Sequence, residues 1–285
     1  MKLKDKVAII TGGGRGIGEA TALAFAREGA RVVLVARTVP ELEQVAAKVK
    51  DLGGEAQIVP ADVSSRQAVA SMVRTAVDSF GQVDILLNAA GVYGPIGRVW
   101  EVDAEEWAQA MEVNLLGTFF TCQAALPHMV RRRQGCIINF SGGGATSPLP
   151  RFTAYGVSKT AVVRLTETLA EEVKGFNIRV NAIAPGMVDT RLQDAVLAAG
   201  ERAGELLPRV RRLRETGDGG APRELAAELA VFLSSEASGS LTGKLIAAPY
   251  DGWESWDDER IGELMAVPWF TLRRMDHFTL RPFGQ

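Results

Sequence analysis

The chain has 285 residues, of which 47% are hydrophobic, so it is long enough to bury a large core within one α/β domain. Its 32 Lys and Arg residues nearly balance 34 Asp and Glu residues, which argues against a nucleic-acid-binding protein, because such proteins usually carry a basic excess. No apolar stretch approaches the roughly 20 residues of a membrane span, and two cysteines and two histidines offer little for a disulfide framework or a metal site.

Residues 6–11 form a β-branched run that predicts a first strand, and glycines follow at positions 12, 13, 14, 16 and 18 before a helical pattern begins. This order is the context that a phosphate-binding turn requires, because Gly allows close backbone approach and a helix start offers unpaired N–H groups. We therefore predict a dinucleotide site at Gly12, Gly14, Gly16 and Gly18. The strand follows the first residues directly, so we see no signal peptide and expect a cytoplasmic protein.

The rest of the chain alternates between strands and helices. We predict further strands at 31–35, 56–59, 83–87, 136–140, 178–183 and 245–248. We predict helices at 40–52, 65–80, 105–132, 153–173 and 225–233. Such alternation predicts a single Rossmann-type doubly wound parallel sheet with helices on both faces. A sheet of this kind binds its ligand at the carboxyl ends of its strands.

The end of the second predicted strand decides which dinucleotide the site prefers. An acidic residue there would bind the ribose 2′-OH of NAD, but the sequence at 35–38 contains no carboxylate. Arg37 is present instead, and its guanidinium suits the 2′-phosphate of NADP. Arg15, inside the glycine loop, offers a second cation. We therefore expect NADP rather than NAD, with solvated surface arginines as the alternative.

Tyr155 and Lys159 are four residues apart in a predicted helix, so they lie on one face of it. A free tyrosine titrates near pH ~10 and is a poor acid or base at neutrality. A nearby cation favours the phenolate and lowers that pKa. The pair therefore predicts an acid/base tyrosine beside the dinucleotide site.

Together these motifs resemble the short-chain dehydrogenase/reductase family over residues 6–243. Residues 11–18 match its TGxxxGxG loop, and residues 88–91 match its NNAG-like segment, with Leu87 in place of the preceding Asn. The other matches are the Asn of the central helix, the serine after the fifth strand, the YxxxK pair and the PG turn: Asn114, Ser141, Tyr155, Lys159, Pro185 and Gly186.

The resemblance implies a catalytic role for each of four residues. Tyr155 would be the general acid in reduction and the base in oxidation, while Ser141 would hold the carbonyl oxygen. Lys159 would lower the Tyr155 pKa and bind the nicotinamide ribose. Asn114 would support a water chain, although a satisfied buried amide is the alternative. Ser147 stays open as an alternative to Ser141, because the loop before Tyr155 is slightly long for the family.

The resemblance and the glycine loop also mark the residues expected to bind the cofactor. Asp62 and Val63 match the family's adenine-contacting pair, with a turn or cap residue as the alternative for Asp62. The full expected set is Gly12, Gly14, Arg15, Gly16, Ile17, Gly18, Arg37, Asp62, Val63, Asn88, Ala89, Gly91, Tyr155, Lys159, Pro185, Gly186, Val188 and Thr190. We expect no metal site.

Two segments lie outside the shared motifs. The segment after the PG turn usually covers the substrate in this family, so the resemblance implies a lid at residues 187–221. The basic stretch at 208–214 suggests either an anion contact or, as we favour, a solvated helix face. Residues 251–285 are rich in aromatic residues, so we expect them to pack on the body, at a subunit interface or beside a substrate pocket. Within them we expect Asp276 and His277 to be structural.

From the sequence we therefore expect an NADP-dependent oxidoreductase that interconverts a carbonyl and a secondary alcohol of a small molecule. A 3-oxoacyl-carrier-protein reductase is the alternative within enzymes, and a non-catalytic NADP-binding regulatory protein is the alternative of another class. Nucleic-acid and membrane partners are not expected. The family resemblance implies a homotetramer or homodimer.

Overall fold

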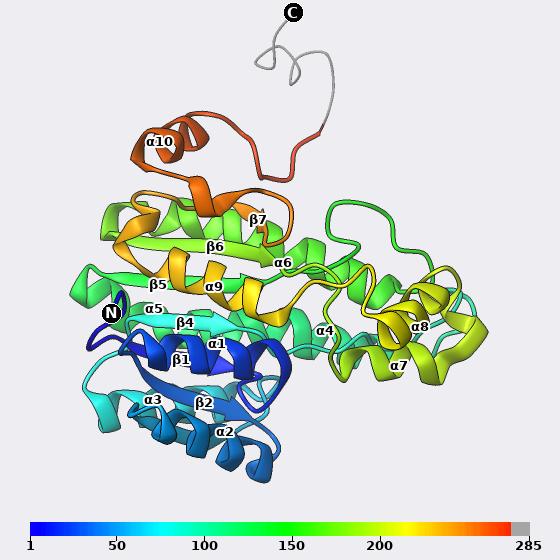
Figure 1. Cartoon of the computed structure of the whole chain (residues 1–285), viewed down its shortest axis with the longest axis horizontal. Coiled ribbons are helices and arrows are strands. Elements are labelled where there is room, and N and C mark those ends of the chain that lie inside the picture. The colour runs from blue at the N-terminus through cyan, green and yellow to red at the C-terminus, as the bar shows by residue number, and fades with distance from the viewer. Residues whose placement is uncertain (275–285) are drawn as a thin grey trace, which may run out of the picture.

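The computed structural model describes residues 1–274, and its centre is a seven-stranded sheet with helices on both faces (Figure 1). All neighbouring strands are parallel, in the order β3-β2-β1-β4-β5-β6-β7. The strands are β1 (Val7–Thr11), β2 (Arg31–Ala36), β3 (Ala56–Pro60), β4 (Ile85–Asn88), β5 (Gly135–Phe140), β6 (Ile178–Ala184) and β7 (Leu245–Ala247). The predicted doubly wound fold is confirmed, and strand order reverses between β1 and β4.

Two helical layers bury the two faces of this sheet. One face packs against α1 (Gly16–Arg27), α2 (Val39–Asp51) and α9 (Arg223–Ser234), and the other packs against α3 (Arg66–Phe80), α5 (Gly117–Arg132) and α6 (Thr153–Glu172). The central strands β1, β4 and β5 are buried along their whole length, as expected for a parallel sheet covered on both sides. Ser65 caps α3 by accepting from the Ala68 N–H, and Gly81 ends it in the left-handed conformation.

The long helix predicted at 105–132 is not one regular α-helix. It consists of α4 (Ala104–Met111), a π-helical turn at Glu112–Leu116 and α5. The π turn contains Asn114, whose side chain is fully buried. A π turn inserts one extra residue into the helical path and is common at functional sites, but local propensity does not reveal it.

Two helices build the predicted lid segment: α7 (Leu192–Ala199) and α8 (Leu206–Thr216). In α8, Leu207, Val210 and Leu213 point inwards, whereas the arginines between them are exposed. This arrangement supports the expected solvated helix face for the basic stretch. Gly217 ends α8 with a φ of 77°, in the left-handed region that favours glycine.

The C-terminal segment folds back over the last strand of the sheet. It contains α10 (Asp258–Ala266), and Trp253 and Leu264 are buried in the main core. The Leu245 N–H of β7 donates to the Phe270 carbonyl at 2.7 Å, so the segment occupies the free edge of this strand. Asp276, His277, Phe278 and Phe283, singled out from the sequence, lie outside the described residues. Within residues 1–274, no helix has the length and apolar character needed to span a bilayer.

Candidate functional site

A cleft of about 700 Å³ opens at the carboxyl ends of β1, β2 and β4. This is the point where the strand order reverses, the place where open α/β sheets bind their ligands. The glycine loop forms its floor, the ends of β2 and β4 form its sides, and the segment leading into α7 closes it from above. The cleft therefore lies where the sequence predicted a dinucleotide.

The glycines of the loop allow its backbone to pack closely, because a side chain at these positions would collide with neighbouring backbone atoms. Gly12 has a φ of 69°, and a Cβ added there would lie 2.9 Å from the Ala90 backbone nitrogen. A Cβ on Gly18 would collide with the Gly12 carbonyl oxygen. Arg15 precedes α1 without a side-chain cap, so the first N–H groups of α1 are free to bind an anion. These features fit a dinucleotide with its pyrophosphate at the start of α1.

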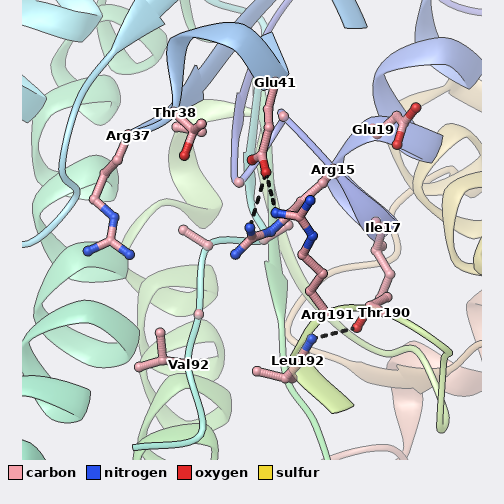
Figure 2. A pocket seen from close by; sticks show the side chains of 18 of the residues that line it. Arg15, Ile17, Glu19, Arg37, Thr38, Glu41, Val92, Thr190, Arg191 and Leu192 are labelled. Atoms are coloured by element: carbon pink, nitrogen blue, oxygen red, sulfur yellow. Dashed lines mark hydrogen bonds and ion pairs between the residues drawn. The ribbon is translucent and has the colours of Figure 1, made fainter. Parts of the chain in front are cut away.

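A cluster of charges lies at one end of the cleft, where Arg15, Glu41 and Arg191 meet (Figure 2). Oε1 of Glu41 accepts from Nη1 of Arg191 at 2.7 Å and from Nη1 of Arg15 at 3.3 Å. Glu41 lies in the first turn of α2, and the sequence analysis assigned no role to it or to Arg191. The cleft therefore contains a carboxylate near the end of β2, although none is present at 35–38.

Arg37 lines the same cleft, and its side chain points away from the Glu41 cluster (Figure 2). Nη1 of Arg37 lies 3.8 Å from Oδ2 of Asp62, a long ion pair between two exposed side chains. Burial acts to raise the pKa of Asp62, but hydrogen bonds from Ser64 and the charge of Arg37 hold it below its usual value. Asp62 also begins a turn that Ser64 closes, so both sequence readings of this residue fit.

Asn114 fixes the loop that follows β4. Its Oδ1 accepts from the Val92 N–H at 2.9 Å, and its Nδ2 donates to the Val92 carbonyl at 2.8 Å and to Oγ of Ser158 at 2.9 Å. A Cβ on Gly91 would lie 3.2 Å from Oδ1 of Asn114 and 3.5 Å from Nζ of Lys159. Asn114 is thus a satisfied buried amide that also brings the cleft wall up to Lys159.

Ser141, Tyr155 and Lys159 come together beside the end of β5. A Cβ on Gly142 would collide with Oη of Tyr155, so the phenol lies against the residue that follows Ser141. Oγ of Ser141 is buried and has no hydrogen-bond partner within the described residues. Nζ of Lys159 donates to the Phe140 carbonyl at 2.8 Å. Ser147 is exposed, which favours Ser141 as the serine of the site.

Burial shifts the pKa values of Tyr155 and Lys159. It raises the pKa of the Tyr155 phenol, and Tyr93 raises it further. Burial also lowers the pKa of Lys159 to about 8. In the protein without a cofactor, the Tyr155 pKa is therefore raised, the opposite of the direction predicted for a tyrosine beside a cation. The physical reason is that desolvation outweighs a cation whose Nζ lies 5.7 Å from the phenol ring centroid.

Tyr93 packs against the phenol ring of Tyr155. Its ring lies edge-on to Tyr155 with centroids 4.7 Å apart, and edge-on to Phe152 at 5.2 Å. Oη of Tyr93 donates to Oε1 of Gln193 in α7 at 3.3 Å. Apolar side chains of the lid, among them Val196 and Val210, complete this cluster. An apolar cluster thus covers Tyr155, and neither Tyr93 nor Gln193 was among the residues predicted from the sequence.

Most of the predicted cofactor residues line the cleft. These are Gly12, Gly14, Arg15, Gly16, Ile17, Gly18, Arg37, Asp62, Val63, Ala89, Gly91 and Thr190. Asn88 instead points into the protein, where it donates to Oδ1 of Asn139 and accepts from Thr121. Tyr155 and Lys159 lie behind Tyr93 and Gly91, and Gly186 packs on Pro249. Val188 is buried and accepts a hydrogen bond from Gln193 through its carbonyl.

Comparison with known proteins agrees with this geometry. Residues 6–200 match the family model described as short chain dehydrogenase. The chain is 35% identical over 247 residues to the 3-oxoacyl-[acyl-carrier-protein] reductase FabG of Thermotoga maritima, covering 86% of this chain and 97% of that protein. It is 38% identical over 245 residues to the short-chain reductase protein NovJ of Streptomyces niveus, covering 85% and 92%.

A solved structure supports the same relationship. The NAD⁺-bound xylitol dehydrogenase superposes with a TM-score of 0.80 at 31% identity, covering 87% of this chain and 98% of that one. The chain belongs to the short-chain dehydrogenase family, as the motifs indicated. It is an NAD(P)-dependent oxidoreductase that acts on carbonyl and alcohol groups.

Proposed function

We propose that this enzyme interconverts a carbonyl and a secondary alcohol with NADP as cofactor and Tyr155 as the general acid/base. The observation that supports this most directly is the position of the Tyr155 hydroxyl. It lies against Gly142, the residue that follows Ser141, and one helical turn from Lys159, while the buried Ser141 hydroxyl has no hydrogen-bond partner among residues 1–274. Buried hydroxyls almost always have a partner, so an unpartnered one suits a site that awaits a carbonyl oxygen.

The proposed chemistry divides between the cofactor and the protein. When bound, the nicotinamide ring supplies or accepts the hydride. In reduction, Tyr155 donates its proton to the oxygen that becomes the alcohol, and Ser141 donates a hydrogen bond to the same oxygen. Asn114 positions the loop at Val92 and, in this proposal, supports the water chain that returns the proton.

The shifts in the pKa values of Tyr155 and Lys159 suit reduction of a carbonyl. With its pKa raised by burial, Tyr155 is protonated at neutral pH and ready to donate. Lys159, with a pKa of about 8, still carries its charge at pH 7 and stabilises the phenolate that remains after proton transfer. Oxidation needs the phenolate first, and the positive charge of an oxidised nicotinamide favours that form.

The choice of NADP depends on the cations of the cleft. Arg15 and Arg37 both line it, and neither is fully neutralised, because Glu41 is shared with Arg191 and Asp62 lies 3.8 Å from Arg37. A 2′-phosphate would give these guanidinium groups a strong charge-assisted partner. The similar xylitol dehydrogenase binds NAD⁺, which supports the dinucleotide class but not the choice of the phosphorylated form.

A 3-oxoacyl-carrier-protein reductase is the second candidate, because a relative of that name is 35% identical over most of both chains. Such a substrate would bring an acidic carrier to the mouth of the site. The exposed arginines of α8 offer a surface for it, although the side chains of α8 that face the site are apolar.

We further propose that the chain forms a homodimer or homotetramer and acts in the cytoplasm. Leu116, Phe119 and Val157 are large apolar side chains exposed at or near the contact between the π turn, α5 and α6. Burying such a face against a second copy would remove this apolar surface from water. Sedimentation velocity is expected to show dimers or tetramers, whereas a monomer at micromolar concentration would contradict this.

Replacing Tyr155 with Phe tests the function directly. The substitution keeps the ring and removes the acid, so we expect turnover of a responsive carbonyl substrate to fall by about 10²–10⁴-fold. Binding of NADPH, followed by its fluorescence, should stay nearly unchanged. Substrates are found by following NADPH consumption with sugars, steroids, quinones and oxoacyl thioesters.

Three results would each contradict a part of the proposal. Equal turnover in Tyr155→Phe would remove Tyr155 from the chemistry. Tighter binding of NADH than of NADPH to the parent protein would overturn the cofactor assignment. NADPH binding without turnover of any substrate class would favour the non-catalytic regulatory alternative.

A further inference from the structure

The Glu41–Arg191 ion pair joins two walls of the cleft that are 150 positions apart in the sequence (Figure 2). Glu41 belongs to α2 at the floor, whereas Arg191 immediately precedes α7 in the lid segment. The pair thus lies across the space that the dinucleotide is proposed to enter. A ligand there must meet, displace or replace this contact.

We propose that Arg191 is a cofactor-binding residue that exchanges the carboxylate of Glu41 for a phosphate group of the dinucleotide. This inference rests on the proposed function, because it requires a nicotinamide dinucleotide in the cleft. The phosphate is either the 2′-phosphate or the pyrophosphate, since both offer the same anionic oxygens to a guanidinium.

The carboxylate of this cluster is largely buried, whereas its two guanidinium groups are exposed. The side chain of Glu41 is only 17% exposed, whereas the side chains of Arg15 and Arg191 are 54% and 64% exposed. A Cβ on Gly14 would lie 3.1 Å from Cβ of Glu41, so the carboxylate is packed beside the glycine loop. Two exposed cations therefore converge on one largely buried anion that lines the cleft.

The charges of this cluster do not balance, and a phosphate would correct that. Glu41 contributes one negative charge, and both arginines donate to the same oxygen, Oε1. A guanidinium carries five N–H donors, so most donors of Arg15 and Arg191 have no partner in this cluster. A phosphate offers more oxygens and more charge, and it can accept bidentate contacts.

The lid segment does not depend on Glu41 to stay in place. Arg214 of α8 forms ion pairs with Asp189 and with Asp194, the latter at 2.8 Å, and donates to the Thr190 carbonyl at 3.0 Å. Cγ2 of Thr190 would lie 3.3 Å from a Cβ on Gly16, so the backbone beside Arg191 already packs on the glycine loop. The contact across the cleft is therefore additional to those that hold the segment, which favours a role toward a ligand.

Two substitutions distinguish this role from that of an ion pair that only holds α2 and the lid segment together. Each of them breaks the same ion pair, but their expected effects on dinucleotide binding are opposite. In the proposal, Arg191→Ala removes a phosphate ligand, whereas Glu41→Gln removes a competing anion and keeps the shape. We expect fluorescence titration to show NADPH binding weakened about tenfold by Arg191→Ala and tightened by Glu41→Gln. Arg212→Ala, an exposed lid arginine paired with Asp218, is the matched control and should bind NADPH as the parent does.

The outcomes are distinct. If both substitutions weakened NADPH binding equally, the ion pair would have a structural role only, and the inference would be overturned. Unchanged NADPH binding in Arg191→Ala would overturn it as well. NADH serves as the second probe: a loss confined to NADPH assigns the contact to the 2′-phosphate, and an equal loss assigns it to the pyrophosphate. A parent protein that binds neither dinucleotide would overturn the proposed function together with this inference. Thermal unfolding without ligand checks that each variant is folded.

Discussion

The cofactor half and the substrate half of the site are built in different ways. The cofactor cleft consists largely of backbone and small residues at strand ends, with Gly12 and Gly18 where no side chain fits. The substrate half consists of side chains from distant segments, among them Tyr93, Phe152 and Val196. A cleft made by backbone keeps one shape for one cofactor, whereas a chamber made by side chains changes with each substitution. This is how one fold serves many substrates.

Lys159 lies where the two halves meet, and its replacement should give the largest effect on stability. Burial lowers its pKa from 10.5 to about 8, so the folded protein binds fewer protons than the unfolded chain between these values. Stability is therefore expected to rise with pH across this window. Below pH 8 the buried charge costs up to about 3 kcal/mol, which Lys159→Met should recover at pH 7.

Chemical denaturation of both proteins at pH 7 and near pH 10 measures this effect. The advantage of Lys159→Met should shrink towards the higher pH, because the parent then loses its buried charge. A variant that is less stable than the parent at pH 7 would show instead that the hydrogen bond to Phe140 outweighs the desolvation of the amine. In that case the junction of the two halves would be a structural support and not a strained site.

A smaller effect is expected from Tyr93→Phe, which addresses the substrate half alone. Tyr155 is only 7% exposed beneath Tyr93, so a substrate reaches it only when Tyr93 and α7 move apart. The substitution keeps the ring and removes the hydrogen bond to Gln193, which is worth about 1 kcal/mol. We expect kcat/KM to rise roughly three- to fivefold, with NADPH binding unchanged.

Tyr250→Phe is the matched control, because Tyr250 is 80% exposed and lies outside the apolar cluster. A fall in kcat/KM in Tyr93→Phe alone would mean that the Tyr93 hydroxyl contacts the substrate. It would then belong to the binding surface and not to a closure of the site.

The sequence predicted most of the residues that line the cleft because its signals are local. Strand, glycine loop and helix are adjacent in the chain, and Tyr155 and Lys159 are one helical turn apart. Glu41 has no such local signal, because it lies beyond the strand end, in the first turn of a helix. A glutamate there usually serves only to compensate the helix dipole. Only its contact with Arg191, far away in the sequence, reveals its place in the cleft.

Other differences between the predictions and the structure also arise from contacts between segments that are far apart in the sequence. Asn88 ends a strand beside the glycine loop, yet its side chain bonds to Asn139, its register partner on β5. The pKa of Tyr155 was expected to follow the nearest cation, but burial, which depends on Tyr93 and the lid, outweighs it. Tyr93 itself has no sequence signature, because its role comes entirely from the segments that converge on it.

The covered edge of β7 has a consequence for how this protein can be handled. An exposed edge strand invites pairing with other chains, and here Phe270 accepts the Leu245 N–H in place of a neighbour. The same segment is held by α6, since Arg164 donates to the Leu272 carbonyl and Glu167 accepts from the Leu272 N–H at 2.6 Å. Removing the C-terminal segment to obtain a minimal enzyme would thus expose the edge of β7, which could then pair with strands of other chains. It would also remove the contacts that Arg164 and Glu167 make from α6, the helix that carries Tyr155.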